Sequence, residues 1–175
     1  MNPEEKSPAG LPGNDNKLQD DYITKPALQA SFSMFRNSFD TKPAGVATLA
    51  QLAADIRGGK WRAQVEQLRA MNAEEYSQNK RNLQAAAFGG TFTRRKKDAL
   101  INPSRLVVID IDHVEGQELA SIKARLMADQ HTALLFVSPS GNGLKAVFVA
   151  EFTDDATFKQ AWRAIAAYLQ ETQGI

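Results

Sequence analysis

The chain has 175 residues, of which 43% are hydrophobic and 23% charged, and its 21 Lys and Arg nearly balance its 20 Asp and Glu. This length suits one domain with a substantial core and is too short for two domains of typical size. The absence of cysteine excludes a disulfide framework, a thiolate metal site and a cysteine nucleophile. No apolar run approaches the roughly 18–20 residues that cross a bilayer, and no signal segment opens the chain. We therefore expect a soluble, cytoplasmic protein with no membrane partner.

The first 27 residues are rich in Pro, Gly and Asn and show no apolar periodicity. Such a composition cannot bury enough surface to offset the entropy of ordering, which predicts a disordered tail before one domain over residues 28–175. Alternation over Ser31–Phe35 predicts a half-buried strand. Apolar residues from Val46 to Ile56 share one helical stripe, which Gly58-Gly59 would end.

The next segment is basic. Between Arg57 and Lys97 there are ten Lys or Arg and three Glu, a net +7 in a chain whose overall charge is +1. This local excess favours a polyanionic partner, although solvated helix faces would produce it too. Short helices are expected around residues 61–68 and 73–83, and a strand with a glycine kink over Phe88–Thr93.

The last third of the chain alternates strands and helices. The run Leu106–Asp112 is nearly continuous in apolar, largely β-branched residues, which predicts a central strand buried on both faces. A helix through Leu119, Ile122 and Leu126 is expected after it, followed by strands Ala133–Val137 and Leu144–Val149. Thr153 or Asp154 would cap a last helix. The inner face of this helix would carry Phe158, Trp162, Ile165 and Leu169. This order predicts an α+β fold with a mixed or antiparallel sheet and a small α-rich part near the N-terminus.

Asp110 and Asp112 stand at the end of the apolar strand. Alternation places both carboxylates on the same face, where they repel each other unless a cation or water compensates them. Oxygen ligands select Mg²⁺ or Mn²⁺, which commonly bind one or two carboxylates together with substrate phosphates. The simpler alternative is that the strand ends here and both acids face water.

The loop between the last two strands is a candidate anion site. Its two glycines, Gly141 and Gly143, permit left-handed backbone geometry, so that successive N–H groups can point into one concavity. The hydroxyls of Ser138 and Ser140 and the ammonium of Lys145 would add further donors. A plain β-hairpin turn at Asn142-Gly143 is the alternative.

Other candidates carry less chemistry. His113 follows Asp112 directly and could serve as a ligand or general base, or be a surface residue. Four consecutive cations could grip a phosphate backbone or form a solvated loop: Arg94, Arg95, Lys96 and Lys97. The Trp and Phe residues stand at helical or strand spacing, which favours core packing over base stacking.

The motif Val-Ile-Asp-Ile-Asp, followed about thirty residues later by Ser-Pro-Ser-Gly-Asn-Gly-Leu-Lys, resembles the first two motifs of the archaeo-eukaryotic primase (primase–polymerase) superfamily. The upstream Phe-Gly-Gly-Thr-Phe segment and Arg94-Arg95 are similar to those of its VirE N-terminal-type branch. The resemblance covers residues 31–175. It departs from much of the superfamily at Lys145, where a His usually ends the second motif.

The resemblance implies an RRM-like catalytic core for nucleotidyl transfer in DNA replication. Asp110 and Asp112 would be catalytic residues that hold Mg²⁺ or Mn²⁺, and five residues would bind a nucleoside triphosphate: Ser138, Ser140, Gly141, Gly143 and Lys145. The basic run Arg94–Lys97 would bind a single-stranded DNA or RNA template, and a fused or associated helicase is an expected partner. The superfamily's third acidic residue would follow a helix like 156–172, so we expect a C-terminally truncated domain, and whether this chain catalyses by itself stays open.

Functions of other classes remain alternatives. A non-catalytic single-stranded nucleic-acid-binding module, from a replication or mobile-element protein, would show salt-sensitive binding without dependence on cations or nucleotides. A nucleotide-sugar transferase also uses Asp-x-Asp, but this chain leaves no length for an acceptor region. A Toprim-type domain would need a catalytic Glu at an earlier strand end, which the sequence does not offer.

Overall fold

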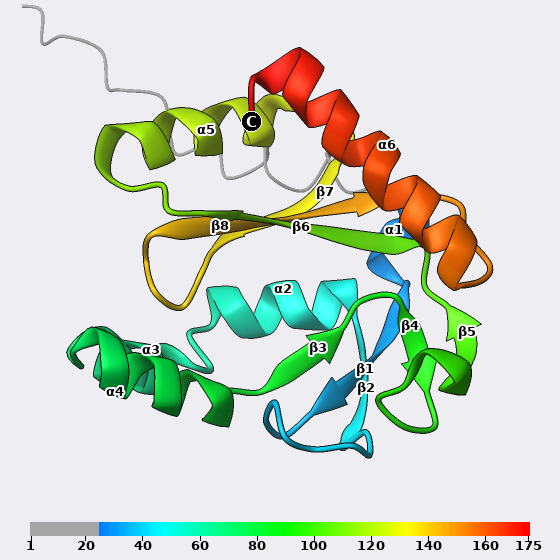
Figure 1. Ribbon diagram of the computed structural model, residues 1–175, viewed down its shortest axis with the longest axis horizontal. Coiled ribbons are helices and arrows are strands. Elements are labelled where there is room, and N and C mark those ends of the chain that lie inside the picture. The colour runs from blue at the N-terminus through cyan, green and yellow to red at the C-terminus, as the bar shows by residue number, and fades with distance from the viewer. Residues whose placement is uncertain (1–24) are drawn as a thin grey trace, which may run out of the picture.

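The computed structural model describes residues 25–175 (Figure 1). The tail expected over residues 1–27 lies outside the described residues, except for its last three. Those belong to the short helix α1 (Lys25–Leu28), and Ala27 is buried in the core. The fold is α+β, as predicted, with helices packed on small antiparallel sheets.

The first sheet is formed by segments far apart in the sequence. Its middle strand β1 (Ser31–Phe35) pairs antiparallel with β2 (Gly45–Thr48) and with β3 (Ala85–Ala87). The helix predicted from Val46 begins later, because Val46 lies in β2 with 60% of its surface exposed. Thr48 caps α2 (Leu49–Arg57) through a capping box with Gln51, which fixes where the helix starts.

The basic segment folds into short helices and a two-stranded sheet. The helices are α3 (Arg62–Arg69), α4 (Ala73–Asn79) and the 3-10 helices η2 (Lys80–Asn82) and η3 (Lys97–Ala99). The strand expected over Phe88–Thr93 is shorter than predicted: it is β4 (Gly90–Phe92), which pairs with β5 (Leu100–Pro103), and a turn at Phe88-Gly89 separates it from β3. Gly90 has φ 152°, and any side chain there would collide with the carbonyl oxygen of Asn102.

The C-terminal sheet carries the candidate site. Its strands are β6 (Leu106–Asp112), β7 (Thr132–Val137) and β8 (Gly143–Val149), in the antiparallel order β6-β8-β7. The prediction of β6 as a central strand was wrong in one respect: both faces are packed, but β8 lies in the middle and β6 at an edge. With α5 (Gly116–Ala128) and α6 (Asp155–Gln173), the elements follow the order β-α-β-β-α, as in the first five elements of a ferredoxin-like β-α-β-β-α-β unit.

Two apolar clusters cover the two faces of this sheet. On one face, Ile109 and Phe148 of the sheet pack with Leu126 of α5 and Leu169 of α6 (Figure 1). On the other face, Val147 packs with Phe32 from β1 and with residues of α2. Trp162, expected on the inner face of the last helix, is instead 44% exposed. No helix within residues 25–175 has the length and apolar character needed to cross a membrane.

Candidate functional site

The candidate site lies where β6 ends beside the start of β8. In the antiparallel register Asp110 is opposite Lys145 and Asp112 is opposite Gly143. Directly opposed residues point to the same face of a sheet, so Asp110, Asp112 and Lys145 share one face. It is the face that packs on α2 and β1, since Val108 and Val147 lie on it too. The pairing of β6 with β8 therefore places the Asp-x-Asp motif directly beside the residues that end the hairpin motif.

A charged pair occupies the middle of the site. The ammonium of Lys145 donates a hydrogen bond of 2.6 Å to Oδ1 of Asp110, with side chains 30% and 47% exposed. Asp112 is exposed and has no hydrogen-bond or ion-pair partner within residues 25–175. One of the two carboxylates is therefore compensated by a cation of the protein, and the other only by solvent.

The loop of the β7–β8 hairpin borders the carboxylates. Ser138 donates its N–H to the carbonyl of Gly143 at 2.8 Å, and Gly141, at φ 88°, donates to the carbonyl of Ser138 at 3.0 Å. The segment is a β-hairpin loop, but its hydrogen-bonded turn is centred on Pro139-Ser140 and not on the expected Asn142-Gly143, since Gly143 already belongs to β8. These two N–H groups are engaged within the loop. The hydroxyls of Ser138 and Ser140 lie 2.8 Å apart.

Gly143 is the point of closest approach between loop and strand. A Cβ at this position would lie 2.7 Å from the carbonyl oxygen of Ile111, 3.2 Å from Oγ of Ser138 and 3.3 Å from Oδ1 of Asp112. The hydroxyl and the carboxylate therefore approach glycine from the same side. The structure brings together all seven residues that sequence reasoning assigned to metal and nucleotide: Asp110, Asp112, Ser138, Ser140, Gly141, Gly143 and Lys145.

Arg69 is a member of the site that sequence reasoning missed. From the end of α3 it donates Nε to the carbonyl of Pro139 at 2.9 Å and Nη2 to that of Ser138 at 3.2 Å. It thereby ties the hairpin to the N-terminal half of the domain across some seventy positions of sequence. Nothing local marks this arginine among the other cations of its segment.

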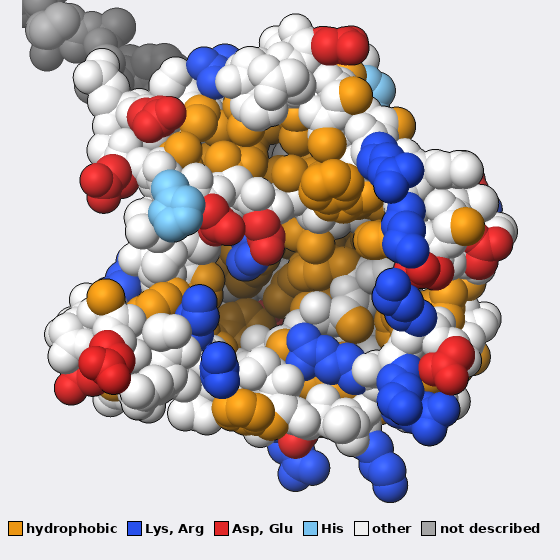
Figure 2. All heavy atoms as spheres, in the orientation of Figure 1, with side chains coloured by type: hydrophobic (Ala, Val, Ile, Leu, Met, Phe, Trp, Pro, Cys, Tyr) orange, Lys and Arg blue, Asp and Glu red, His pale blue; other side chains and the backbone are white. Residues whose placement is uncertain are grey.

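The charged end of the sheet opens on a cleft between the two halves of the domain. This cavity measures about 550 Å³, within the size range of small-molecule sites. Its polar lining includes Asp110, Lys145, Ser138, Arg62 and Arg69, and its apolar lining includes residues of α2, α3 and β3. Figure 2 shows the face of the molecule hollowed between these halves, with acidic and basic side chains at its borders.

The donor set limits what the site can hold. Among residues 25–175 no group of three or more His, Asp or Glu side chains converges on one point. Two carboxylates and adjacent hydroxyls fit one hard cation that completes its shell with water or phosphate oxygens. They do not by themselves fit a pair of cations. His113, exposed and in the left-handed region at φ 61°, stands next to Asp112.

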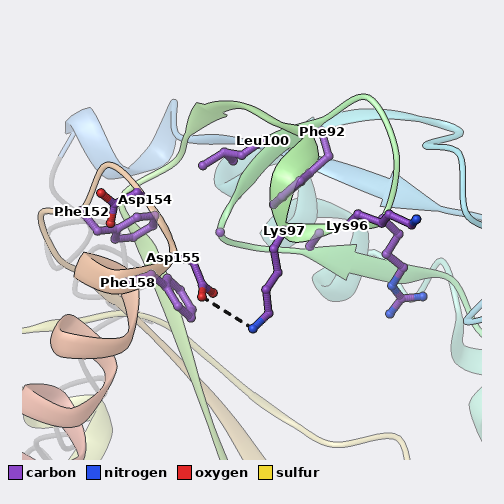
Figure 3. A pocket seen from close by; sticks show the side chains of 11 residues that line it. Phe92, Lys96, Lys97, Leu100, Phe152, Asp154, Asp155 and Phe158 are labelled. Carbon is purple, nitrogen blue, oxygen red and sulfur yellow. Dashed lines mark ion pairs between the residues drawn. The ribbon is translucent and has the colours of Figure 1, made fainter.

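The predicted basic run lies elsewhere. Arg95, Lys96 and Lys97 line a second cavity of about 350 Å³, which shares no lining residue with the first (Figure 3). Arg94 instead pairs with Asp98 at 3.4 Å. The structure therefore separates the expected strand-binding cations from the paired aspartates.

Two aspartates at this second cavity, Asp154 and Asp155, have lowered pKa values. The pKa of Asp154 lies below its ordinary value because the backbone N–H and hydroxyl of Thr157 donate to its carboxylate. The pKa of Asp155 is lowered mainly by the hydrogen bond from Lys159, with a further contribution from the charge of Lys97. Both groups are therefore carboxylates near neutral pH.

Comparison with known proteins identifies the class. The family model BT4734-like, N-terminal domain, matches residues 78–173, which is more than half of the chain. The chain therefore belongs to this family, and the match includes the aspartate pair, the hairpin and the basic run. No curated protein and no solved structure matches the chain.

Proposed function

We propose that this domain is primase–polymerase-like and binds a nucleoside triphosphate together with Mg²⁺ or Mn²⁺ for template-directed nucleotidyl transfer in DNA replication. The observation that carries the proposal is the register of β6 on β8, which sets Asp110 opposite Lys145 and Asp112 opposite Gly143. A phosphate tail with its cation needs carboxylates and phosphate-binding donors within a few ångströms of each other. Three of these groups, Asp110, Ser138 and Lys145, line a cleft large enough for a nucleotide.

Each group has a distinct part in binding. Asp110 and Asp112 would hold the cation, and the cation would neutralise charge on the phosphates. Lys145 now neutralises Asp110, and it is freed to pair with a phosphate once a cation takes that place. The hydroxyls of Ser138 and Ser140 would donate to phosphate oxygens, while Gly141 and Gly143 leave the loop without side chains that would obstruct them.

The reaction asks little covalent chemistry of the protein. The 3′-hydroxyl oxygen of the growing strand attacks the α-phosphorus, the bond to pyrophosphate breaks, and the hydroxyl proton leaves to solvent or a nearby base. The protein contributes position and charge compensation. Since the described carboxylates suit one cation, binding of the nucleotide is the first consequence to test and catalysis is tested separately.

The binding test measures a fluorescent deoxynucleoside triphosphate with Mn²⁺, with Mg²⁺ and with EDTA. Affinity should require the divalent cation and should fall at least tenfold in the double variant Asp110→Asn plus Asp112→Asn. The control is Asp40→Asn plus Asp55→Asn, which removes two carboxylates that are ion-paired outside the cleft. Primer synthesis and extension are then measured with this chain and with the same double variant.

The outcomes separate the two functions. Nucleotide binding that is unchanged in the double variant would overturn the assignment of the aspartates. Salt-sensitive binding of single strands that needs neither cation nor nucleotide would then support the non-catalytic binding module instead.

A further inference from the structure

The second cavity combines an apolar interior with a charged border of three cations, Arg95, Lys96 and Lys97, and two carboxylates, Asp154 and Asp155, a net positive charge. Phe92 of β4 and Leu100 of β5 enter it from one side (Figure 3). Phe152, in the segment before α6, and Phe158, in the first turn of α6, enter it from the other. Its lining is mostly apolar and its volume of about 350 Å³ is within the range of ligand sites. A ligand here would have an apolar body and a negatively charged end.

The aromatic rings are held in place by their surroundings. Phe158 packs edge-on against buried Phe152, with ring centroids 5.1 Å apart, and lies over Gly89, where an added Cβ would be 3.9 Å from its ring. The N–H of Phe92 is bound to Oγ of Ser33 at 2.9 Å, and its side chain is half-buried. Rigid, partly exposed rings offer a stacking surface at little entropic cost.

The three cations of this cavity, Arg95, Lys96 and Lys97, differ in the contacts that their side chains make. Arg95 donates to the carbonyl of Ser38 at 2.9 Å and lies over the ring of Phe35. Lys97 pairs with Asp155 at 3.6 Å. Lys96 is exposed and has no ion-pair partner within residues 25–175, so its ammonium is available to an anion.

The two cavities adjoin along one short segment. Ala86 and Phe88 line the first cleft, while Ala87 and Gly89 line the second. Because successive residues of a strand face opposite sides, the two cavities lie on opposite sides of this segment.

We propose that the second cavity binds one nucleotide of a single-stranded nucleic acid. The base stacks on Phe92 and Phe158, and the adjoining phosphate pairs with Lys96 beside Arg95 and Lys97. This inference deepens the proposed function by naming the strand-binding site, and it rests on that function only for the strand's role as template.

The test measures binding of labelled oligo-dT, about twelve nucleotides long, in EDTA and without nucleoside triphosphate. An abasic sugar–phosphate oligomer of the same length is the comparison. Phe92→Ala should weaken binding of oligo-dT about five- to a hundredfold, as loss of one stacked base does, and leave the abasic oligomer unaffected. Phe92→Trp should keep the preference for bases, and Phe92→Leu, which preserves apolar packing, should lose it.

The phosphate contact is tested through salt. Lys96→Gln should weaken both oligomers and reduce the slope of log affinity against log salt by about 0.7, the value for one phosphate of a single strand. Matched controls on exposed positions of α6 are Trp162→Ala and Arg163→Gln, which should leave both oligomers bound as before.

The results distinguish this inference from the proposed function. Equal affinity for oligo-dT and the abasic oligomer, or unchanged binding by both Phe92→Leu and Lys96→Gln, would overturn the second site. Nucleotide binding that depends on Asp110 and Asp112 would still stand in that case. Conversely, strand binding lost in the Phe92 and Lys96 variants supports the second site even when the aspartate variants bind nucleotide normally.

Discussion

Asp112→Asn should stabilise the isolated domain slightly while abolishing cation-dependent nucleotide binding. Asp110 and Asp112 are two residues apart on one strand face, a separation of about 6.6 Å. At that distance two unit charges in a water-like dielectric repel by about 0.6 kcal/mol. Asp112 has no partner within residues 25–175 to lose, so neutralising it removes repulsion and breaks no contact.

Asp110→Asn supplies the comparison, because the same relief is offset by loss of the pair with Lys145. That pair is 30% and 47% exposed, and such pairs contribute about 0.2–1 kcal/mol. The net change should therefore lie within about 0.5 kcal/mol of zero. The difference between the two variants in free energy of unfolding should therefore equal the contribution of the ion pair between Asp110 and Lys145.

The assay is urea unfolding in EDTA, followed by the same titration with Mn²⁺ and a deoxynucleoside triphosphate. A ligand at a hundred times its Kd should stabilise the wild type by about 2.7 kcal/mol and neither variant. A loss of more than about 1 kcal/mol for Asp112→Asn in EDTA would refute the reasoning, since it would show a structural role for this carboxylate.

Three further changes test the geometry of the site and its support. Gly143→Ala should cost about 1–3 kcal/mol in urea unfolding and weaken nucleotide binding, because its Cβ would press on the strand β6 backbone; an unchanged midpoint would contradict the register. Asp154→Asn keeps the α6 cap but removes a group whose pKa is held below 3.8 by the N–H of Thr157. Stability that this carboxylate contributes is present above pH 3.8 and lost as the pH falls through its lowered pKa, so acid melting curves should fall more steeply for wild type than for the variant; parallel curves would refute this. Leu126→Ala, at a fully buried position of α5, should cost about 2–5 kcal/mol in urea unfolding, and a loss below about 1 kcal/mol would argue against the packing of α5 on the sheet.

Membership of the BT4734-like N-terminal domain family covers the aspartate pair and the hairpin but begins after α3. Arg69 and the wall of the cleft formed by α2 and α3 therefore lie outside the matched residues.

Local sequence determined much of the C-terminal half. The strand ending in Asp110-Ile-Asp112 and the capped start of α6 at Asp154 follow from side-chain alternation and from the hydrogen-bonding needs of a helix terminus. The same alternation placed both carboxylates on one face. These features depend only on residues a few positions apart in the chain, so the sequence alone is enough to predict them.

Tertiary structure decided what faces the carboxylates. Val46 belongs to a strand because it pairs with Ser33 of β1. Strand β6 lies at an edge of its sheet because β8 pairs with both β6 and β7. Asp110 and Lys145, which form an ion pair, are 35 residues apart in the sequence. Arg69 and the hairpin carbonyls that it binds are about 70 residues apart. Such contacts depend on strand register and on packing of distant faces, which side-chain periodicity does not encode.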